Sequence, residues 1–494
     1  MIRRCVPARR LLLPGVVAIA IAGRAAAQFV ESDVSLIHEW VGEAPGDGLG
    51  WAVAVLSDVS GDGIPELIVP APFNDAGASN AGRVYVYSGA TGMALPGLTL
   101  TAGSANANLG YSIADAGDVN GDGVADVIAG LPQVGTTGAG SVRIYSGATG
   151  MLIRAIAGQA SGDAFGYSVA GAGDVNGDGR ADVLVGAPFH DTAGASAGRA
   201  YVYSATNGVR LHSWDGEAAG DRLGSGIASV GDLNGDGIPE HVVGAPAAGP
   251  GAVGRAYVYD GSTHLAAFPP LQAEPTGGAF GEFFVGPAGD SNADGVPDVY
   301  VGDYADSACY VFSGIDGQRL HFIEGDLSEG LGCGRAAGDV NNDGYDDLAV
   351  GAYLNSDGAP QAGRVYLFSG RDGSTLRTIT STRAGENSGF DAIGAGDLNG
   401  DGWIDVLVGA AGPGGNRAYV VAGVPLWQPG DMNCDGQLNV LDINAFVLAL
   451  SDPGGYSGQY PECELLNGDL DGNGGVDVLD INPFVAALAG QATR

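Results

Sequence analysis

A stretch of nine residues, written seven times, constrains the fold of this 494-residue chain more than any other feature. The third copy, Asp174–Asp182, has oxygen-bearing side chains at positions 1, 3, 5 and 9 and glycine at position 6. Successive copies begin 49 residues (290 to 339) to 60 residues (58 to 118) apart, a period that indicates repeated supersecondary units. The seven copies are Asp58–Glu66, Asp118–Asp126, Asp174–Asp182, Asp232–Glu240, Asp290–Asp298, Asp339–Asp347 and Asp397–Asp405.

Each period contains four short runs of β-branched, aromatic and apolar residues, separated by turns rich in Gly, Asp, Asn and Pro. In the third period these runs are Phe165–Ala170, Val183–Pro188, Gly198–Tyr203 and Val209–Trp214. Such runs are typical of strands. Seven periods of four antiparallel strands predict an all-β fold, a seven-bladed β-propeller. An open solenoid would need capping repeats at both ends, and the sequence offers none.

The two ends of the repeat region complement each other. The seventh period reaches its third strand at Asn416–Val421 and has no fourth run, whereas Ser35–Trp40 precedes the first period without a partner. That segment resembles fourth strands such as Arg210–Trp214. We therefore expect the N-terminal strand, at about residues 35–40, to complete the last blade and remove the exposed sheet edges.

The nine-residue stretch also has the ligand spacing of a tight calcium loop, in which position 7 contributes only a backbone carbonyl. Closely spaced carboxylates repel one another, and a divalent cation removes that cost. The sequence therefore predicts up to seven Ca²⁺ ions in the ring. The predicted side-chain ligands are Asp58, Ser60, Asp62, Glu66, Asp118, Asn120, Asp122, Asp126, Asp174, Asn176, Asp178, Asp182, Asp232, Asn234, Asp236, Glu240, Asp290, Asn292, Asp294, Asp298, Asp339, Asn341, Asp343, Asp347, Asp397, Asn399, Asp401 and Asp405.

The loops differ in quality. Ser60 replaces Asn at position 3 of the first loop, and Glu66 and Glu240 lengthen position 9 by one methylene. Ala293 and Asn342 replace the glycine at position 4, and a left-handed backbone there would penalise alanine. A site with a Kd of about 10⁻⁴ M in about 1 mM calcium contributes roughly 1.4 kcal/mol. Seven such sites suggest structural ions rather than catalytic metals.

Two further signals flank the loops. Phe165-Gly166 and Phe280-Gly281 precede loops, and Gly186-Ala187-Pro188 and Gly244-Ala245-Pro246 follow them. These residues resemble FG-GAP repeats, the units of the integrin alpha-chain propeller. The resemblance implies calcium in at least some blades, and ligand recognition on the face opposite the calcium loops. Connections between the second and third strands vary most in length and lie on that opposite face, which agrees with recognition there.

After the repeat region the sequence predicts helices instead of strands. Asp431–Asp442 precedes a predicted helix at Ile443–Leu450, and 38 residues later Asp469–Asp480 precedes another at Ile481–Leu488. Oxygen side chains at positions 1, 3, 5, 9 and 12 with glycine at position 6 follow the EF-hand loop pattern. Up to two more Ca²⁺ ions are predicted here. The ligands are Asp431, Asn433, Asp435, Asn439, Asp442, Asp469, Asp471, Asn473, Asp477 and Asp480.

These two loop–helix units resemble a type I dockerin, which implies a cohesin-like or cell-envelope partner. Phe446, Val447, Phe484 and Val485 are either an exposed docking surface or the small core of the module itself. Cysteines at 434 and 463 are the expected disulfide pair, and a bond between Cys309 and Cys333 is possible.

Composition limits the partners and the compartment. With 57 acidic and 21 basic residues, the formal net charge is −36, which argues against nucleic acid and anionic membranes. Residues 1–27 have a basic start, an apolar core and a small-residue end, and predict a secretory signal peptide. No segment after them is long and apolar enough to span a membrane. We therefore expect a secreted, extracellular or cell-surface protein.

The predicted domains are a signal peptide at 1–27, a propeller at 28–427 and a dockerin-like domain at 428–494. The predicted function is a calcium-binding recognition or adhesion protein, whose propeller binds a protein or glycan while the tail tethers it. No catalytic residues are predicted, because the six histidines are scattered and Gly194–Gly198, which spells GxSxG, lies between strands. Alternatives are a component of extracellular polysaccharide degradation, as dockerins accompany glycoside hydrolases, and a structural surface component.

Overall fold

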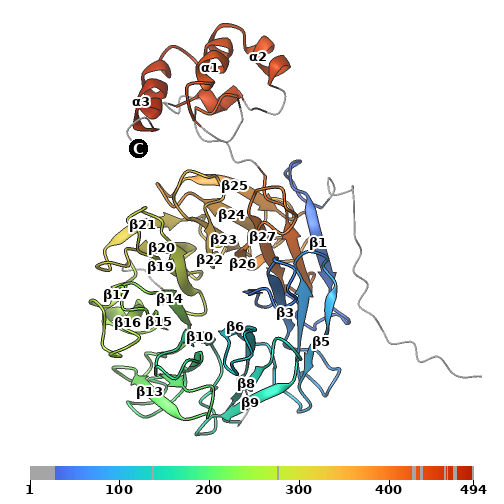
Figure 1. Cartoon of the computed structure of the whole chain (residues 1–494), viewed down its shortest axis with the longest axis vertical. Helices are drawn as coiled ribbons and strands as arrows, with labels where there is room; N and C mark the ends of the chain where they lie inside the picture. Colours follow the sequence, from blue (N-terminus) through green and yellow to red (C-terminus); the bar gives the residue numbers. More distant parts are fainter. Residues whose placement is uncertain are drawn as a thin grey trace, which may run out of the picture.

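The computed structural model describes residues 28–135, 138–274, 278–424, 430–433, 438–460, 463, 465–470 and 475–491. The predicted signal peptide at 1–27 lies outside these residues. Seven four-stranded antiparallel sheets stand around a common centre (Figure 1). The prediction of a seven-bladed propeller is therefore confirmed.

The first four blades follow one another along the chain, and in each the strands pair in sequence order. Their strands are β2 (Ala54–Leu56), β3 (Glu66–Ala71), β4 (Arg83–Ser88) and β5 (Ala94–Thr101); β6 (Ile113–Gly117), β7 (Asp126–Leu131), β8 (Ser141–Tyr145) and β9 (Leu152–Ala157); β10 (Val169–Gly173), β11 (Asp182–Ala187), β12 (Arg199–Tyr203) and β13 (Arg210–Asp215); and β14 (Ile227–Gly231), β15 (Glu240–Ala245), β16 (Arg255–Tyr259) and β17 (Leu271–Gln272).

The last three blades complete the circle, and a short 3₁₀ helix, η1 (Pro250–Ala252), lies between β15 and β16. Their strands are β18 (Val285–Gly289), β19 (Asp298–Asp303), β20 (Ala308–Phe312) and β21 (Arg319–Glu324); β22 (Leu331–Gly338), β23 (Asp347–Ala352), β24 (Arg364–Phe368) and β25 (Thr375–Thr380); and β26 (Ser388–Gly396), β27 (Asp405–Ala410), β28 (Arg417–Val421) and β1 (Leu36–Val41).

The seventh blade takes its outer strand from the other end of the ring, because β1 pairs antiparallel with β28. Trp40 of β1 stacks on Tyr87 of the first blade at 4.5 Å and donates its indole N–H to the Gly92 carbonyl at 2.9 Å. Trp214 of β13 makes the same pair of contacts with the fourth blade, stacking on Tyr259 at 4.5 Å. The N-terminal strand thus occupies the place of an ordinary fourth strand.

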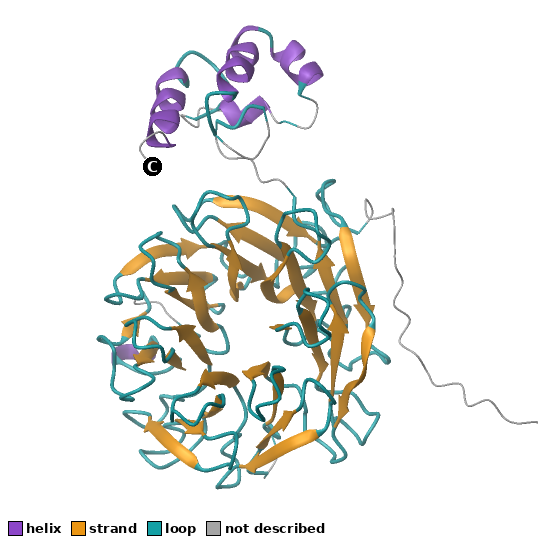
Figure 2. Ribbon diagram, viewed as in Figure 1, coloured by secondary structure: helices purple, strands orange, loops and turns teal. Residues whose placement is uncertain are grey.

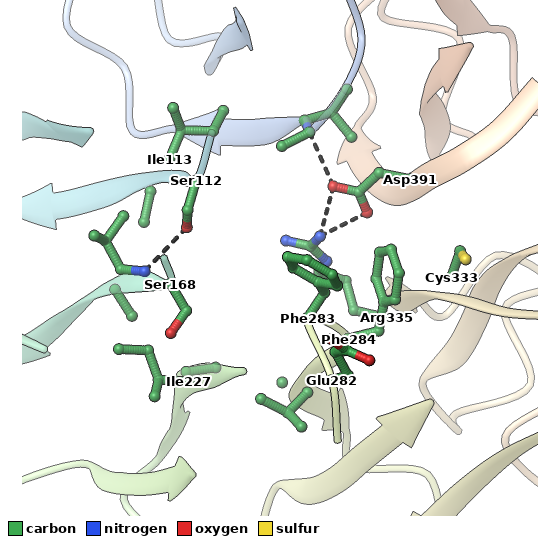
Figure 3. A pocket seen from close by; sticks show the side chains of 18 of the residues that line it. Ser112, Ile113, Ser168, Ile227, Glu282, Phe283, Phe284, Cys333, Arg335 and Asp391 are labelled. Carbon is green, nitrogen blue, oxygen red and sulfur yellow. Dashed lines mark hydrogen bonds and ion pairs between the residues drawn. The ribbon is translucent and has the colours of Figure 1, made fainter. Parts of the chain in front are cut away.

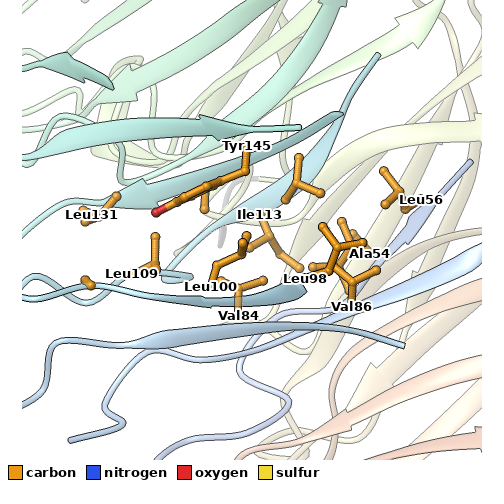
Figure 4. Packing of buried hydrophobic residues seen from close by; sticks show 14 of the residues in the cluster. Ala54, Leu56, Val84, Val86, Leu98, Leu100, Leu109, Ile113, Leu131 and Tyr145 are labelled. Atoms are coloured by element: carbon orange, nitrogen blue, oxygen red, sulfur yellow. The ribbon is translucent and has the colours of Figure 1, made fainter. Parts of the chain in front are cut away.

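The hydrophobic core of the ring is divided among the junctions between neighbouring blades. Figure 4 shows the junction of the first two blades, where Leu56, Val84 and Val86 pack against Ile113 and Tyr145. Similar clusters fill the other junctions, including the one between the seventh and first blades. Each blade therefore buries both faces of its sheet, and its second strands are buried along their whole length.

The tail contains three short helices, α1 (Asp442–Ser451), α2 (Pro453–Gln459) and α3 (Ile481–Gln491), and a 3₁₀ turn, η2 (Leu465–Gly468) (Figure 2). Two of the helices begin near the predicted positions, whereas α2 lies in a Gly-rich segment without helical periodicity. The Asp452 side chain accepts a hydrogen bond from Gly455 N at 3.0 Å and caps α2. None of the helices in the described part of the chain is long and apolar enough to cross a membrane.

The cysteines differ from the prediction in one respect. Cys309 in β20 and Cys333 in β22 are buried free thiols, so the possible disulfide between them is wrong. Burial raises the pKa of the Cys309 thiol to about 12, which keeps it protonated and inert. Cys463 is disulfide-bonded, and its predicted partner, Cys434, lies outside the described residues.

Candidate functional site

All seven predicted calcium loops connect the first and second strands of a blade, and they share one backbone design. In the third loop, Asp174 accepts hydrogen bonds from Asp178 N at 3.0 Å and Gly179 N at 2.7 Å. Asp178 in turn accepts from Arg180 N at 3.1 Å. These bonds wrap the backbone of the loop around the first carboxylate.

The position-9 carboxylate sits at the base of each loop, where the second strand begins. Asp126 accepts from Val119 N at 3.0 Å and, from the turn between β8 and β9, from Gly147 N at 3.1 Å. The loops and the third-to-fourth-strand turns therefore lie on one face of the ring, which we call the calcium face. In the third loop the Asn176 side-chain amide donates to the Asp182 carboxylate at 2.9 Å. Rotating this amide by 180° would exchange its nitrogen for its oxygen, which could then serve as a ligand.

Like charges and burial perturb these carboxylates. Burial, reinforced by Asp178 and Asp174, raises the pKa of Asp182 to about 7. Burial likewise raises the pKa of Asp298 to about 7 and that of Asp347 to about 8. A charged carboxylate at position 9 therefore lacks a compensating cation, which is the electrostatic condition that a divalent ion satisfies.

The first loop gives the most direct test of fit. Among the described residues, one acidic triplet brings an oxygen from each member within 4.8 Å of the others, and it consists of Asp58, Asp62 and Glu66. Glu66 Oε1 is buried and has no hydrogen-bond partner in the described part of the chain. A buried carboxylate oxygen without a partner, on a residue that lies close to two exposed carboxylates, fits a cation ligand. The other six loops share the hydrogen-bond design but do not bring three carboxylates this close.

The two loops without glycine at position 4 do adopt the left-handed backbone. Ala293 has φ of 57° and Asn342 has φ of 57°, close to the 72° of Gly177 at the same position. Asparagine tolerates this region better than alanine does, because its side chain can bond to the local backbone. The fifth loop therefore has the backbone strain that the sequence predicts, because Ala293 adopts the left-handed conformation.

The tail loops place their position-12 aspartates alike. Asp442 accepts from Met432 N at 2.8 Å and from Asn439 N at 2.7 Å. Asp480 accepts from Leu470 N and Asp477 N, each at 2.8 Å. Both carboxylates are fully buried. The predicted ligands Asp435, Asp471 and Asn473 lie outside the described residues.

The structure of the tail distinguishes two buried phenylalanines from two exposed valines, the four residues whose role the sequence left open. Phe446 and Phe484 are buried and stack with ring centroids 4.0 Å apart, so they form the core of the module. Val447 and Val485 remain 54% and 57% exposed. Aliphatic residues at equivalent positions of the two loops, Val440, Leu441, Val478 and Leu479, are exposed as well.

The opposite face, which we call the loop face, carries the connections between second and third strands. They range from four residues at 304–307 to eleven at 72–82, 188–198 and 353–363. Gly194–Gly198 lies in one of these connections and not at a strand–turn–helix elbow, which agrees with its exclusion as a nucleophile motif.

A cavity of about 440 Å³ opens at the centre of the ring (Figure 3). Aromatic side chains, half-buried except for the buried Tyr167, surround it. They come from residues just before the first strands, or within β26 in the case of Phe390, and from residues just after the second strands. Neighbouring rings lie 4.8 to 6.3 Å apart between centroids and form a closed circle, which we call the aromatic belt. On one side it comprises Trp51, Tyr111, Tyr167 and Phe283. On the other side it comprises Phe284, Tyr304, Tyr353 and Phe390.

Sequence reasoning missed this belt. Its signal was the aromatic residue that follows the repeated glycine, as in Gly110-Tyr111 and Gly166-Tyr167. In the sequence these residues adjoin or begin runs that predict strands, and a period-2 pattern does not say which inner strand ends meet at the centre.

Family models match four segments of the ring. The FG-GAP repeat matches residues 49–87, 165–203 and 224–259, and the FG-GAP-like repeat matches residues 339–408. The three FG-GAP matches each begin just before a first strand and end in the third strand of the same blade. The FG-GAP-like match runs from the loop of the sixth blade into the second strand of the seventh.

Integrin alpha chains are among the curated proteins that this chain resembles. Integrin alpha-V of Gallus gallus is 35% identical over 210 residues, which are 40% of this chain and 20% of the relative. Integrin alpha-IIb of Homo sapiens is 35% identical over 218 residues, 41% of this chain and 20% of the relative. The chain thus spans about a fifth of the length of these relatives. The matched repeats, the seven-bladed ring and the integrin alpha relatives together support an FG-GAP propeller in this chain.

Proposed function

We propose that this protein is a secreted, calcium-binding recognition or adhesion protein that has no catalytic activity. The observation that supports it most is the pairing of an integrin-alpha-like propeller with long connections gathered on the loop face. Long loops on a rigid scaffold are where recognition is usually located. The ligand is a protein or a glycan, bound on the loop face.

Calcium gives the scaffold its rigidity in this proposal. The seven loops bind calcium through their side chains at positions 1, 3, 5 and 9, and the convergent oxygens of Asp58, Asp62 and Glu66 support this. Because the loops lie on the calcium face, the ions stabilise the ring without touching the ligand.

The tail serves as a tether. Two similar loop–helix units expose the same aliphatic positions, Val447 in one and Val485 in the other, which suits docking to a cohesin-like or envelope partner. The position-12 aspartates Asp442 and Asp480 organise both loops and support the prediction of up to two calcium ions here.

Binding of the calcium-loaded, full-length protein to a glycan array and to envelope proteins tests the recognition role. Each long loop is replaced in turn by the four-residue connection 304–307 of the fifth blade, and Met93→Asp on the calcium face is the matched control. We expect at least one loop replacement to abolish binding and the control to retain it. Binding that survives every loop replacement, or no binding at all, would contradict the proposal.

The tether is tested separately by retention on the envelope. Val447→Asp together with Val485→Asp should release the protein, whereas Val30→Asp, an equally exposed valine of the ring, should not. Equal retention of both variants would exclude these residues as the docking surface.

A further inference from the structure

We propose that Asn176 of the third calcium loop is a site of spontaneous deamidation, which proceeds through a succinimide formed with the amide nitrogen of Gly177. The ring contains four further Asn-Gly pairs, and the fold protects them. They are Asn120-Gly121, Asn207-Gly208, Asn234-Gly235 and Asn399-Gly400. This modification site is additional to the ligand of the loop face, and the reaction does not require calcium.

Local sequence does not single out Asn176. Glycine has no side chain to obstruct attack by its own nitrogen, so every Asn-Gly pair is intrinsically reactive. The hexapeptide Asp-Val-Asn-Gly-Asp-Gly occurs at 118–123 and again, unchanged, at 174–179. An unfolded chain therefore gives Asn120 and Asn176 the same local chemistry, and a difference between them must come from the folded ring.

The nucleophile of the reaction is the glycine amide, which attacks after it loses its proton. In four of the five pairs this amide is a hydrogen-bond donor. Its acceptors are the position-1 carboxylates Asp118, Asp232 and Asp397 for Gly121, Gly235 and Gly400, and the Ser204 carbonyl for Gly208, at 2.5 to 2.7 Å. Such a bond stabilises the protonated amide and opposes attack. Gly177 N donates to no acceptor in the described part of the chain.

The carboxamide of Asn176 is also held less firmly. In the second loop the Asn120 carbonyl oxygen accepts from Asp122 N at 2.9 Å, which fixes the side chain. In the third loop Asp178 N donates to Asp174 at 3.0 Å and, within this described loop, makes no bond to Asn176. Both asparagine side chains donate to the position-9 carboxylate, so the two loops differ in the carbonyl contact.

Solvent reaches the third loop more freely than the second. Asn176 and Gly177 are exposed, whereas Asn120 is half-buried. The Arg180 guanidinium closes the space around Gly121, because a Cβ added to this glycine would lie 2.0 Å from Nη1 of Arg180. A Cβ added to Gly177 would meet no described atom within 4 Å apart from those of its chain neighbours. The third loop therefore shields the second and leaves its own Asn-Gly pair uncovered.

The reaction balances with water as its single co-reactant. The deprotonated nitrogen of Gly177 attacks Cγ of Asn176 and forms a new N–C bond, while the Cγ–Nδ2 bond breaks and Nδ2 leaves as ammonia with the proton. Water then opens the succinimide at Cγ to give aspartate, or at the main-chain carbonyl to give isoaspartate. Aspartate adds a carboxylate at position 3 of the loop, whereas isoaspartate lengthens the main chain by one carbon.

Peptide mass spectrometry of the full-length protein, incubated in chelator at physiological pH and temperature, tests the site. We expect Asn176 to deamidate at least about tenfold faster than Asn120, because the second loop must first break two backbone hydrogen bonds. In denaturant the two residues should deamidate at equal rates. An unmodified Asn176 in the folded protein, equal rates in the folded protein, or unequal rates in the denatured chain would overturn the proposal.

A variant of the second loop tests the protection. Asp118→Ala removes the acceptor of the Gly121 amide and should raise the rate at Asn120. Asn234 in the same variant keeps its protective bond and should stay slow. The melting temperature shows whether the variant is folded, and the comparison within the wild-type chain needs no variant. An unchanged rate at Asn120 in the folded variant would contradict the proposed protection.

The same incubation with saturating calcium rests on the proposed calcium binding. An ion bound through Oδ1 of Asn176 holds the carboxamide and should slow its deamidation at least about tenfold. Because the reaction in chelator needs no calcium, equal rates with and without calcium would count against an ion in the third loop and leave the result in chelator standing.

Discussion

Arg335 of the sixth blade contacts both carboxylate oxygens of Asp391 in the seventh, at 2.6 and 2.7 Å. Asp391 also accepts from Val53 N of the first blade at 2.9 Å. One buried carboxylate therefore links three consecutive blades at the junction where the two ends of the ring meet. These bonds offset part of the desolvation of Asp391, whose pKa burial still raises. Removing one partner should therefore cost more than breaking an ordinary surface ion pair.

Asp391→Ala should lower the free energy of unfolding by about 2–3 kcal/mol, because it leaves Arg335 half-buried and the Val53 amide without an acceptor. Asp215→Ala breaks the exposed pair with Arg199 and should cost less than about 1 kcal/mol. Denaturant unfolding of both variants measures the difference. Equal losses would show that the junction is not specially stabilised.

Removal of calcium should lower the melting temperature steeply. Seven sites that each contribute about 1.4 kcal/mol sum to roughly 10 kcal/mol, which is comparable to the stability of a domain. Calorimetric melts in chelator, and after calcium is added back, check this at constant ionic strength. If the melt does not change once metal removal has been verified, the ions have no structural role.

Ala293→Gly should stabilise the protein by about 0.5–1 kcal/mol and strengthen the fifth calcium site, since glycine adopts a positive φ without penalty. Asn342→Gly should have a smaller effect, because asparagine already tolerates this backbone. Both are compared with the wild type by denaturant unfolding and calcium titration. A loss of stability in Ala293→Gly would show that the backbone at this position is not strained.

His241 should make the ring sensitive to acid. It is fully buried in the second strand of the fourth blade, and burial lowers its pKa from 6.5 to about 4. Between pH 6.5 and pH 4 the imidazole of His241 is protonated in the unfolded chain but stays neutral in the folded chain. The contribution of His241 to the free energy of unfolding therefore falls as the pH drops, by about 3 kcal/mol in all. The six equivalent positions are aliphatic: Leu67, Val127, Val183, Val299, Leu348 and Val406.

His241→Val supplies that aliphatic residue and should be more stable than the wild type at pH 5, with a smaller difference at pH 8. Denaturant unfolding is measured at pH 5 and pH 8 with saturating calcium. Under this condition protonation of the loop carboxylates does not dominate the pH dependence of stability. A difference that does not depend on pH would show that His241 does not titrate in this way.

The repeated loop and the four runs around it were enough to predict the blades, because turn residues and period-2 runs are local signals that fix strands and their order. Other features could not be predicted from such local signals. Helix α2 is formed by a Gly-rich segment that its cap and its contact with Met432, through the Tyr456 hydroxyl, hold in place. Cys309 and Cys333 lie in neighbouring blades and stay free, which their spacing along the chain does not reveal.

The sequence by itself determined seven blades, the calcium face and the existence of two loop–helix units, since each depends on patterns within a single repeat. Tertiary structure decided which phenylalanines of the tail became core and which valines stayed exposed, because that depends on how two distant helices face each other. Tertiary structure also decided which side chains meet at the centre of the ring. There the small Ser225 of one blade leaves a space that Phe283 of the next blade fills, and only assembly of the ring brings the two residues together.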